Sequence, residues 1–298
     1  RPVTLLGREW QFRPGAVGSR DWERSRLAAL YALAQGDAPV VVATADGLMA
    51  RTLPPETLRS LAITLEVGGQ AELGALAEQL LSAGYTRCEQ VEGVGQFALR
   101  GGILDVFSPL MDQPVRCEFF DDEIDSMGAF DPGTQRRTRN VSSARILPAA
   151  EVLPHCAPGG LPGLADQLTA LAEKLAKKQK TEAIVQTLRE DAERLRSGAA
   201  PGAADRYLAA IYPTVTAGVH YLPPDAVVFL SESGRVDERV KNTVLQQKQD
   251  VEALLSAGVL AGEYAHLTLT AEELYAALED FPVILEDSLP TSRHPLRP

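Results

Sequence analysis

The chain has 298 residues, a length that suits about two domains of ordinary size. Hydrophobic residues make up 45% and charged residues 23%, as in ordinary globular proteins, and no run approaches the roughly 18 apolar residues of a membrane span. The net charge of −11 argues against broad nucleic-acid binding, which requires a basic surface.

Three cysteines without a CxxC spacing do not form a disulfide framework and fit a reducing cytoplasm. The first residues carry neither an initiator Met nor the pattern of a signal peptide. We therefore expect a cytoplasmic protein of which this chain is a fragment.

The first block, residues 1–61, has the order helix, strand, helix. Residues 21–34 have apolar side chains at helical spacing, and residues 40–43 are a short apolar run typical of a buried strand in a parallel sheet. A second helix is expected from Gly47 to Arg51, before Pro54-Pro55 stops it. This order predicts an α/β unit.

The second block, residues 62–150, differs in kind. It predicts a strand over 63–67, an amphipathic helix over 71–83 and then short strands separated by glycine turns at Gly93/Gly95 and Gly101-Gly102. Those short strands are expected over 86–91, 96–100, 103–107, 115–119 and near 144–147. The block therefore reads as an antiparallel α+β module.

The strand over 96–100 has two distinct faces. Phe97 and Leu99 share one face, whereas Gln96, Ala98 and Arg100 share the other. We expect the first face to pack on the helix and the second to meet solvent or a partner.

The third block, residues 151–298, returns to the α/β pattern. Residues 164–196 predict two helices interrupted at 177–180, and residues 225–230 predict another buried strand. A polar helix is expected over 236–257, with strands over 264–269 and 283–285. The predicted fold is an α/β domain, formed by the first and third blocks, that is interrupted by the inserted module.

Catalytic and metal motifs are missing. There is no GxxxxGK[ST], no GxGxxG between a strand and a helix, and no metal-ligand spacing among the four histidines. The acidic run Asp121-Asp122-Glu123 reads as a solvated hairpin turn, although a metal site would need the same residue types. We predict no catalytic residues, no metal and no cofactor.

The strand over 225–230 ends in Ser231 and Glu232. P-loop enzymes place an acidic pair at this position to hold magnesium and orient water. Since a hydroxyl cannot replace the first carboxylate, Ser231 indicates a nucleotide site that is absent or has decayed.

Two segments, GYTRCEQVEGVGQFALRGGILDVFSP and PVRCEFFDDEIDSMGAFDPGTQR, carry a resemblance to a known family. They resemble the second domain of the bacterial transcription-repair coupling factors (Mfd), a module that also occurs in the excision-repair helicase UvrB. UvrB has a working phosphate loop and an Asp-Glu pair after the strand that resembles residues 226–230. This chain has neither, so it is similar to the N-terminal, UvrB-like region of the coupling factors, and the alternative is an NTP-dependent helicase or translocase lobe of the UvrB type.

The resemblance implies a degenerate RecA-like, UvrB-like α/β domain and a non-catalytic role in transcription-coupled nucleotide excision repair. It implies that the inserted module binds the damage-recognition protein UvrA through residues 84–107, and that other domains of the full-length protein mask this surface. The full-length family protein is an ATP-dependent DNA translocase that contacts RNA polymerase and DNA through parts absent here.

Five residues are the expected contacts on the UvrA-binding surface. By the resemblance they are Arg87, Gly95, Gln96, Phe97 and Arg100. UvrB-type sequences have a further arginine where this chain has Ala98, which makes the arginine patch thinner.

Other roles for these arginines stay open. Arg100 has the alternative of pairing with Asp105 or Glu118 across the sheet, at about 0.2–1 kcal/mol. A DNA-binding role would depend on Arg136-Arg137-Thr138-Arg139, which a solvated turn explains equally well.

Overall fold

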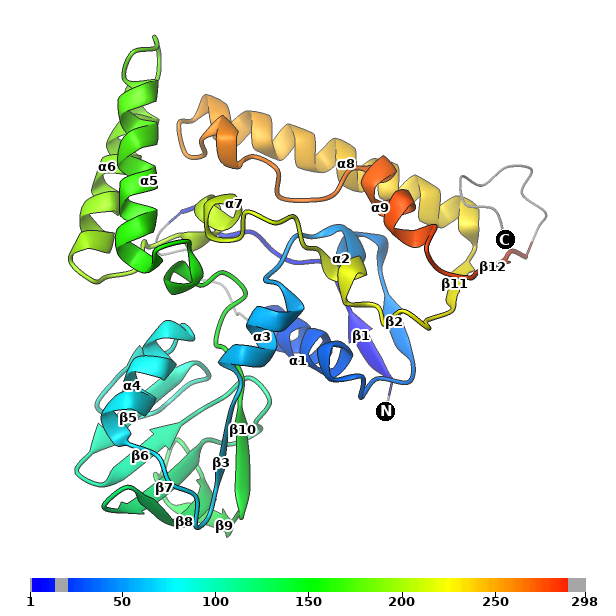
Figure 1. The fold of residues 1–298 in the computed structure, drawn as a ribbon. Helices are drawn as coiled ribbons and strands as arrows, with labels where there is room; N and C mark the ends of the chain where they lie inside the picture. Colours follow the sequence, from blue (N-terminus) through cyan, green and yellow to red (C-terminus); the bar gives the residue numbers. More distant parts are fainter. Residues whose placement is uncertain (1, 14–20, 289–298) are drawn as a thin grey trace.

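The computed structural model describes residues 2–13 and 21–288. It has an α/β body, built from both ends of the chain, and an antiparallel module inserted between them (Figure 1). The predicted fold class is therefore confirmed. Among the described residues, no helix is both long enough and apolar enough to cross a bilayer.

The first part of the body pairs two strands in parallel. Val3 of β1 lies opposite Val41 of β2. The hydroxyl of Thr44 accepts from the Gly47 amide over 3.2 Å and so caps α2. The elements are β1 (Val3–Leu5), α1 (Asp21–Gln35), β2 (Val41–Ala43), α2 (Ala45–Met49) and α3 (Pro55–Leu61).

The module enters and leaves through neighbouring strands, because β3 pairs antiparallel with β10. Between them lies a six-stranded sheet of order β4-β5-β6-β7-β8-β9, in which only the β4–β5 pair is parallel. The elements are β3 (Ile63–Glu66), α4 (Leu73–Ser82), β4 (Thr86–Arg87), β5 (Gln96–Arg100), β6 (Ile103–Val106), β7 (Val115–Phe120), β8 (Glu123–Phe130), β9 (Arg137–Asn140) and β10 (Ser143–Ile146).

One face of the module's sheet packs under α4, as predicted. Phe97, Leu104 and Cys117 are fully buried there with Leu76 and Leu80 of α4. This core follows from the alternation of apolar side chains along each strand.

The other face is partly covered, which corrects the expectation that it is simply open. Ala98 is buried in a second, smaller core with Val91, Phe107 and Phe130. Residues 88–95 account for the difference, because they return over the sheet where a longer strand was predicted. Only Thr86–Arg87 of the predicted strand 86–91 pairs with β5.

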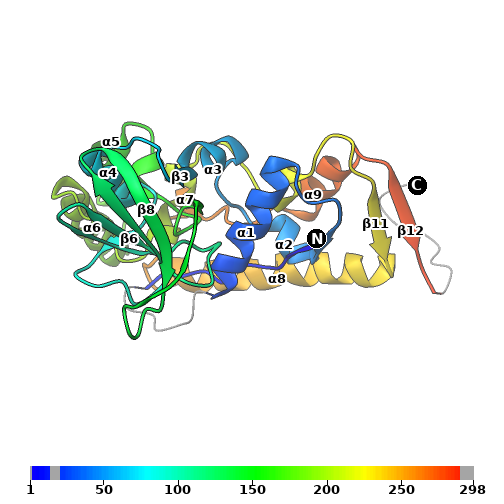
Figure 2. The ribbon, with the colours of Figure 1, turned by 90° about the horizontal axis from the view of Figure 1, so that it is seen from below.

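The second part of the body is mainly helical. Helices α5 and α6 pair as a hairpin that projects from the body, with the predicted break between them, and α8 runs along the length of the molecule (Figures 1 and 2). The elements are η1 (Pro154–Cys156), α5 (Gly160–Leu175), α6 (Glu182–Arg196), η2 (Ala204–Tyr207), α7 (Leu208–Ile211), η3 (Gly218–Tyr221), β11 (Val228–Ser231), α8 (Ser233–Ser256), η4 (Gly262–Tyr264), α9 (Ala271–Leu278) and β12 (Val283–Glu286).

The body strands are parallel, but they are not buried on both faces. β11 pairs in parallel with β12, yet Phe229 of β11 is 64% exposed and Val42 of β2 is 59% exposed. The prediction of buried strands at 40–43 and 225–230 was therefore wrong for one face of each strand. Each of these sheets has only two strands, and the hydrophobic clusters of the body pack against one side of each sheet.

Other elements also differ from prediction, among them the helices α3 and α9, which were not predicted. Residues 264–269 form no strand, because the chain makes the 3₁₀ turn η4 and then a single bridge from Thr268 to Ala50. The strand β1 and the strands β8 and β9 were not predicted. The acidic run does turn the chain at Asp121-Asp122, but Glu123 already begins β8.

A buried ionic cluster joins the two parts of the body beside the module. Glu151 accepts from Arg26 Nε over 2.8 Å and from the Thr52 hydroxyl over 2.6 Å, and Arg8 Nη1 lies 3.6 Å from it. Burial alone would raise the pKa of Glu151, but the charges of Arg26 and Arg8 hold it below its usual value. The cluster fixes the segment that follows the module against α1.

Candidate functional site

The face of the module's sheet opposite α4 carries the arrangement of most interest. We call it the outer face. Its side chains come from every second residue of β5, β6, β7 and β8, and cross-strand partners lie side by side. One row contains Ala98, Asp105, Arg116 and Gly128, and the next contains Arg100, Ile103, Glu118 and Ser126.

Asp105 holds two arginines on this face. Arg100 Nη2 donates to Asp105 Oδ2 over 2.7 Å, while Arg116 donates through Nε over 2.7 Å and through Nη2 over 2.8 Å. The Asp105 side chain is 1% exposed, whereas that of Arg100 is 49% exposed. Asp105 and Glu118 were the two expected partners of Arg100 across the sheet, and the structure contains the pair with Asp105.

Arg116 is the stronger partner of that carboxylate. Its two-pronged contact is the geometry that guanidinium groups favour, and its guanidinium carbon lies 4.7 Å from the ring centre of Phe130. The hydrogen bonds to Asp105 raise the pKa of Arg116. One carboxylate thus serves two guanidinium groups, so pairing with Asp105 does not cancel the charge that Arg100 presents to solvent.

Arg87 and Arg100 do not lie on the same face. Arg87 pairs with Phe97, whose side chain enters the core under α4, and residues paired across a ladder share a face. Arg100 belongs to the outer face. Since Arg87 is exposed on the edge strand β4, a partner that touches both arginines has to wrap around that edge.

The side chains of Gln96 and Phe97 contact other parts of the module. The Gln96 side-chain oxygen accepts from the amides of Glu92 and Gly93 over 2.8 and 3.0 Å, which closes the turn before β5. The Phe97 side chain is fully buried, so it cannot touch a partner directly. Both residues shape the surface that the expected site uses.

The backbone conformation at position 95 favours glycine. The φ of 82° at Gly95 lies in the left-handed region, and a Cβ there would lie 3.3 Å from the Ala149 Cβ. Its amide donates to the Phe107 carbonyl over 2.8 Å. Gly95 therefore fixes the path of the loop between β4 and β5.

The sequence interpretation missed Arg116. Arg116 lies between the apolar residues Val115 and Cys117, so alternation along the strand could have placed it on the face opposite the helix. Its pairing with Asp105 depends on the register between β6 and β7, which the sequence alone does not give.

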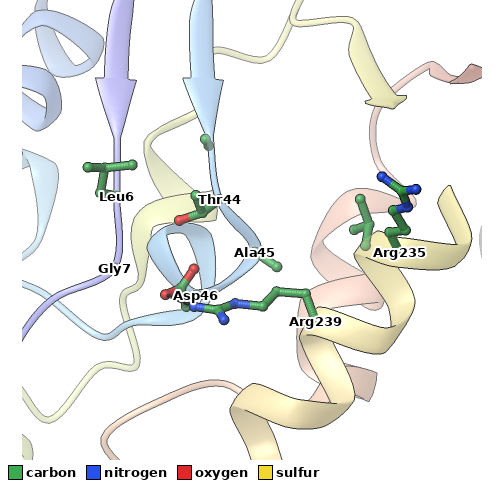
Figure 3. Close-up of a pocket in the computed structure, with 9 residues that line it drawn as sticks. Leu6, Gly7, Thr44, Ala45, Asp46, Arg235 and Arg239 are labelled. Atoms are coloured by element: carbon green, nitrogen blue, oxygen red, sulfur yellow. Dashed lines mark hydrogen bonds and ion pairs between the residues drawn. The ribbon is translucent and has the colours of Figure 1, made fainter. Parts of the chain in front are cut away.

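A pocket lies where α/β domains commonly bind ligands, beyond the carboxyl ends of β1 and β2 (Figure 3). Asp46 reaches into it, with its Oδ2 atom 2.9 Å from Arg239 Nη2 of α8, while Arg235, which also lines the pocket, points away from Asp46 (Figure 3). Burial opposes the charge of Asp46, but hydrogen bonds with Thr44 and Arg239 lower its pKa. An ionised carboxylate therefore stands in this pocket, paired with Arg239.

The strand β11 ends at Ser231, Glu232 follows it, and Ser233 begins α8. The Ser233 hydroxyl donates to Asp287 Oδ2 over 2.8 Å, and Ser288 donates to Glu232. Within residues 2–13 and 21–288, no group of three or more His, Cys, Asp or Glu side chains is placed to hold a metal ion.

Comparison with known proteins gives two findings. Residues 63–151 match the family model described as the UvrB interaction domain. The chain is also similar to curated proteins named transcription-repair-coupling factor. That of Bacillus subtilis (strain 168) is 30% identical over 246 residues, which are 82% of this chain and 21% of the relative.

Two further relatives carry the same name. The protein of Myxococcus xanthus is 39% identical over 176 residues, which are 58% of this chain and 14% of the relative. The protein of Staphylococcus aureus (strain USA300) is 28% identical over 268 residues, which are 87% of this chain and 22% of the relative. The matched parts of the chain thus correspond to 14–22% of the length of these relatives.

Proposed function

The chain belongs to the bacterial transcription-repair coupling factors as their N-terminal UvrB-homology region, and we propose that it is a non-catalytic module that recruits UvrA to damaged DNA. The match to the UvrB interaction domain places the chain in DNA repair. The binding of UvrA is the finer part of the proposal, and it rests on the outer face of the module.

One observation carries the proposal. Arg100 is held by a buried carboxylate whose stronger partner is Arg116, so its guanidinium is positioned in advance and still half exposed. An ordered, exposed arginine loses little side-chain entropy when it binds a carboxylate on a partner, and arginine is enriched among the residues that dominate binding energy. Arg87 extends the contact around the edge strand.

The test is the affinity of the full chain for purified UvrA, measured by calorimetry or surface plasmon resonance. Arg100→Ala should weaken binding about tenfold, and the double variant with Arg87→Ala should weaken it further. Arg189→Ala, an exposed arginine on α6 of the body, is the matched control and should bind as the wild type does. An unchanged dissociation constant in the double variant would refute the site.

The chain is proposed to hydrolyse no nucleotide. Two features support this: Ser231 stands where a magnesium-anchoring aspartate would be, and Asp46 with Arg239 occupies the pocket beyond β1 and β2. The alternative, a nucleotide-driven helicase or translocase lobe, requires ATP binding. Titration of the chain with ATP and magnesium should release no heat, and saturable binding would favour the alternative.

The remaining parts of the proposal concern the whole protein. We propose boundaries at residues 61/62 and 150/151, with residues 1–61 and 151–298 forming one body. We further propose a cytoplasmic protein whose other domains mask the module and supply the ATP-dependent translocase. Contacts with RNA polymerase and DNA would belong to those other domains.

A further inference from the structure

Phe120 is exposed to a degree that folding does not explain. The residue is 76% exposed, the largest fraction among the exposed large hydrophobic residues of the described chain. It ends β7, directly before the Asp121-Asp122 turn, and Asp121 has a φ of 52°. Exposed aromatic rings are costly in water and are enriched at protein interfaces.

Phe120 lies on the outer face, as Arg100 does. Its neighbour Phe119 packs against the core under α4, and the Leu99 side chain does the same beside Arg100. Because successive residues of a strand point to opposite faces, Phe120 and Arg100 both point outward. Arg100 and Phe120 therefore belong to one surface, whereas Arg87 lies on the opposite side of the edge strand.

The turn Gly101-Gly102 brings the two residues to the same end of the sheet. Arg100 directly precedes this turn, and Gly102 accepts from the Phe119 amide over 2.8 Å. A Cβ on Gly102 would lie 3.0 Å from the Phe119 carbonyl oxygen. The small turn lets β7 approach closely and leaves the Phe120 ring uncovered beside it.

We propose that Phe120 is the aromatic anchor of the UvrA-binding surface, with Arg100, two strands away on the same face, as its charged counterpart. This inference rests on the proposed function and extends its site from residues 84–107 to the β7–β8 hairpin. The complementary patch on UvrA would be an apolar pocket for the ring, with a carboxylate toward Arg100 and a basic group toward Asp121 and Asp122. Aromatic residues and arginine are both enriched in protein interfaces.

The test compares two exposed phenylalanines in the full chain. Phe120→Ala should weaken the binding of purified UvrA at least tenfold, and Phe120→Tyr should restore most of it because the ring remains. Phe229→Ala is the matched control, since Phe229 is also exposed but lies on β11, at the opposite end of the molecule from the module (Figure 2). Circular dichroism and thermal melting should be the same for all three variants and the wild type.

The outcomes separate this inference from the proposed function. If the Arg87→Ala/Arg100→Ala variant binds weakly while Phe120→Ala binds normally, Phe120 is not an anchor and the proposed function stands. If Phe120→Ala and Phe229→Ala weaken binding equally, the effect is not specific and the inference fails. If the wild-type chain does not bind UvrA, the proposed function fails and this inference with it.

Discussion

Asp105 and Arg116 face each other across β6 and β7, and both side-chain oxygens of Asp105 accept hydrogen bonds from that one guanidinium. Arg100 shares one of these oxygens. The orientation of the proposed contact residue is therefore set by two residues that are themselves poorly placed to touch a partner.

Asp105→Asn should destabilise the chain and weaken UvrA binding together. The loss of a charged acceptor for two arginines should lower the free energy of unfolding by about 1–3 kcal/mol, because both arginines are partly solvated. Urea denaturation at pH 7 measures this loss. Arg116→Lys, which keeps the charge but loses the two-pronged contact, should show a smaller loss; equal stability of Asp105→Asn and wild type would contradict the role of Asp105.

Phe97→Ala should act through stability. Removal of a fully buried ring should lower the free energy of unfolding by about 3–5 kcal/mol, because the core under α4 would retain a cavity. Phe97→Leu should lose clearly less. Binding should follow the folded fraction at each urea concentration, and a stable Phe97→Ala variant that fails to bind UvrA would instead indicate a direct contact.

Glu151 should make the body sensitive to acid. The pKa of Glu151 is lowered in the folded chain from 4.5, so the folded state binds fewer protons than the unfolded state. Its contribution is therefore fully present above about pH 4.5 and is lost as the pH falls through the folded pKa.

Glu151→Gln should lower the free energy of unfolding by about 3–5 kcal/mol at pH 7, because the buried Arg26 loses its carboxylate partner and Arg8 keeps only its pair with Asp205. Urea titrations at several pH values measure the difference between variant and wild type. That difference should be constant above pH 5 and should shrink below pH 4.5. A difference that grows in acid would contradict this assignment.

Cys117 should resist alkylation in the folded chain. Burial raises the pKa of its thiol to about 12, and the side chain is fully enclosed under α4. Iodoacetamide at pH 8, followed by mass spectrometry, should modify Cys88 and Cys156 before Cys117. Denaturant should abolish the difference, and rapid native labelling of Cys117 would show that the module opens.

The sequence predicted the local elements best where the pattern was long and periodic. The helices over 164–196 and 236–257 and the strands β5, β6 and β7 appeared close to their predicted positions. The strand predicted over 86–91 stopped at Arg87, because the Gln96 side chain draws the following residues into a turn. A side chain that bonds to backbone four residues away leaves no periodic signal.

The candidate site divides in the same way. The sequence by itself placed Arg100 on the face opposite Phe97, since alternation along a strand is a local property. It could not predict that Arg87 and Arg100 lie on different faces or that Ala98 is covered. It also could not predict the pairing of Asp105 with Arg116 or the exposure of Phe120. Each of those depends on which strand lies beside which and in what register, and register is set by contacts between residues that are distant in the sequence.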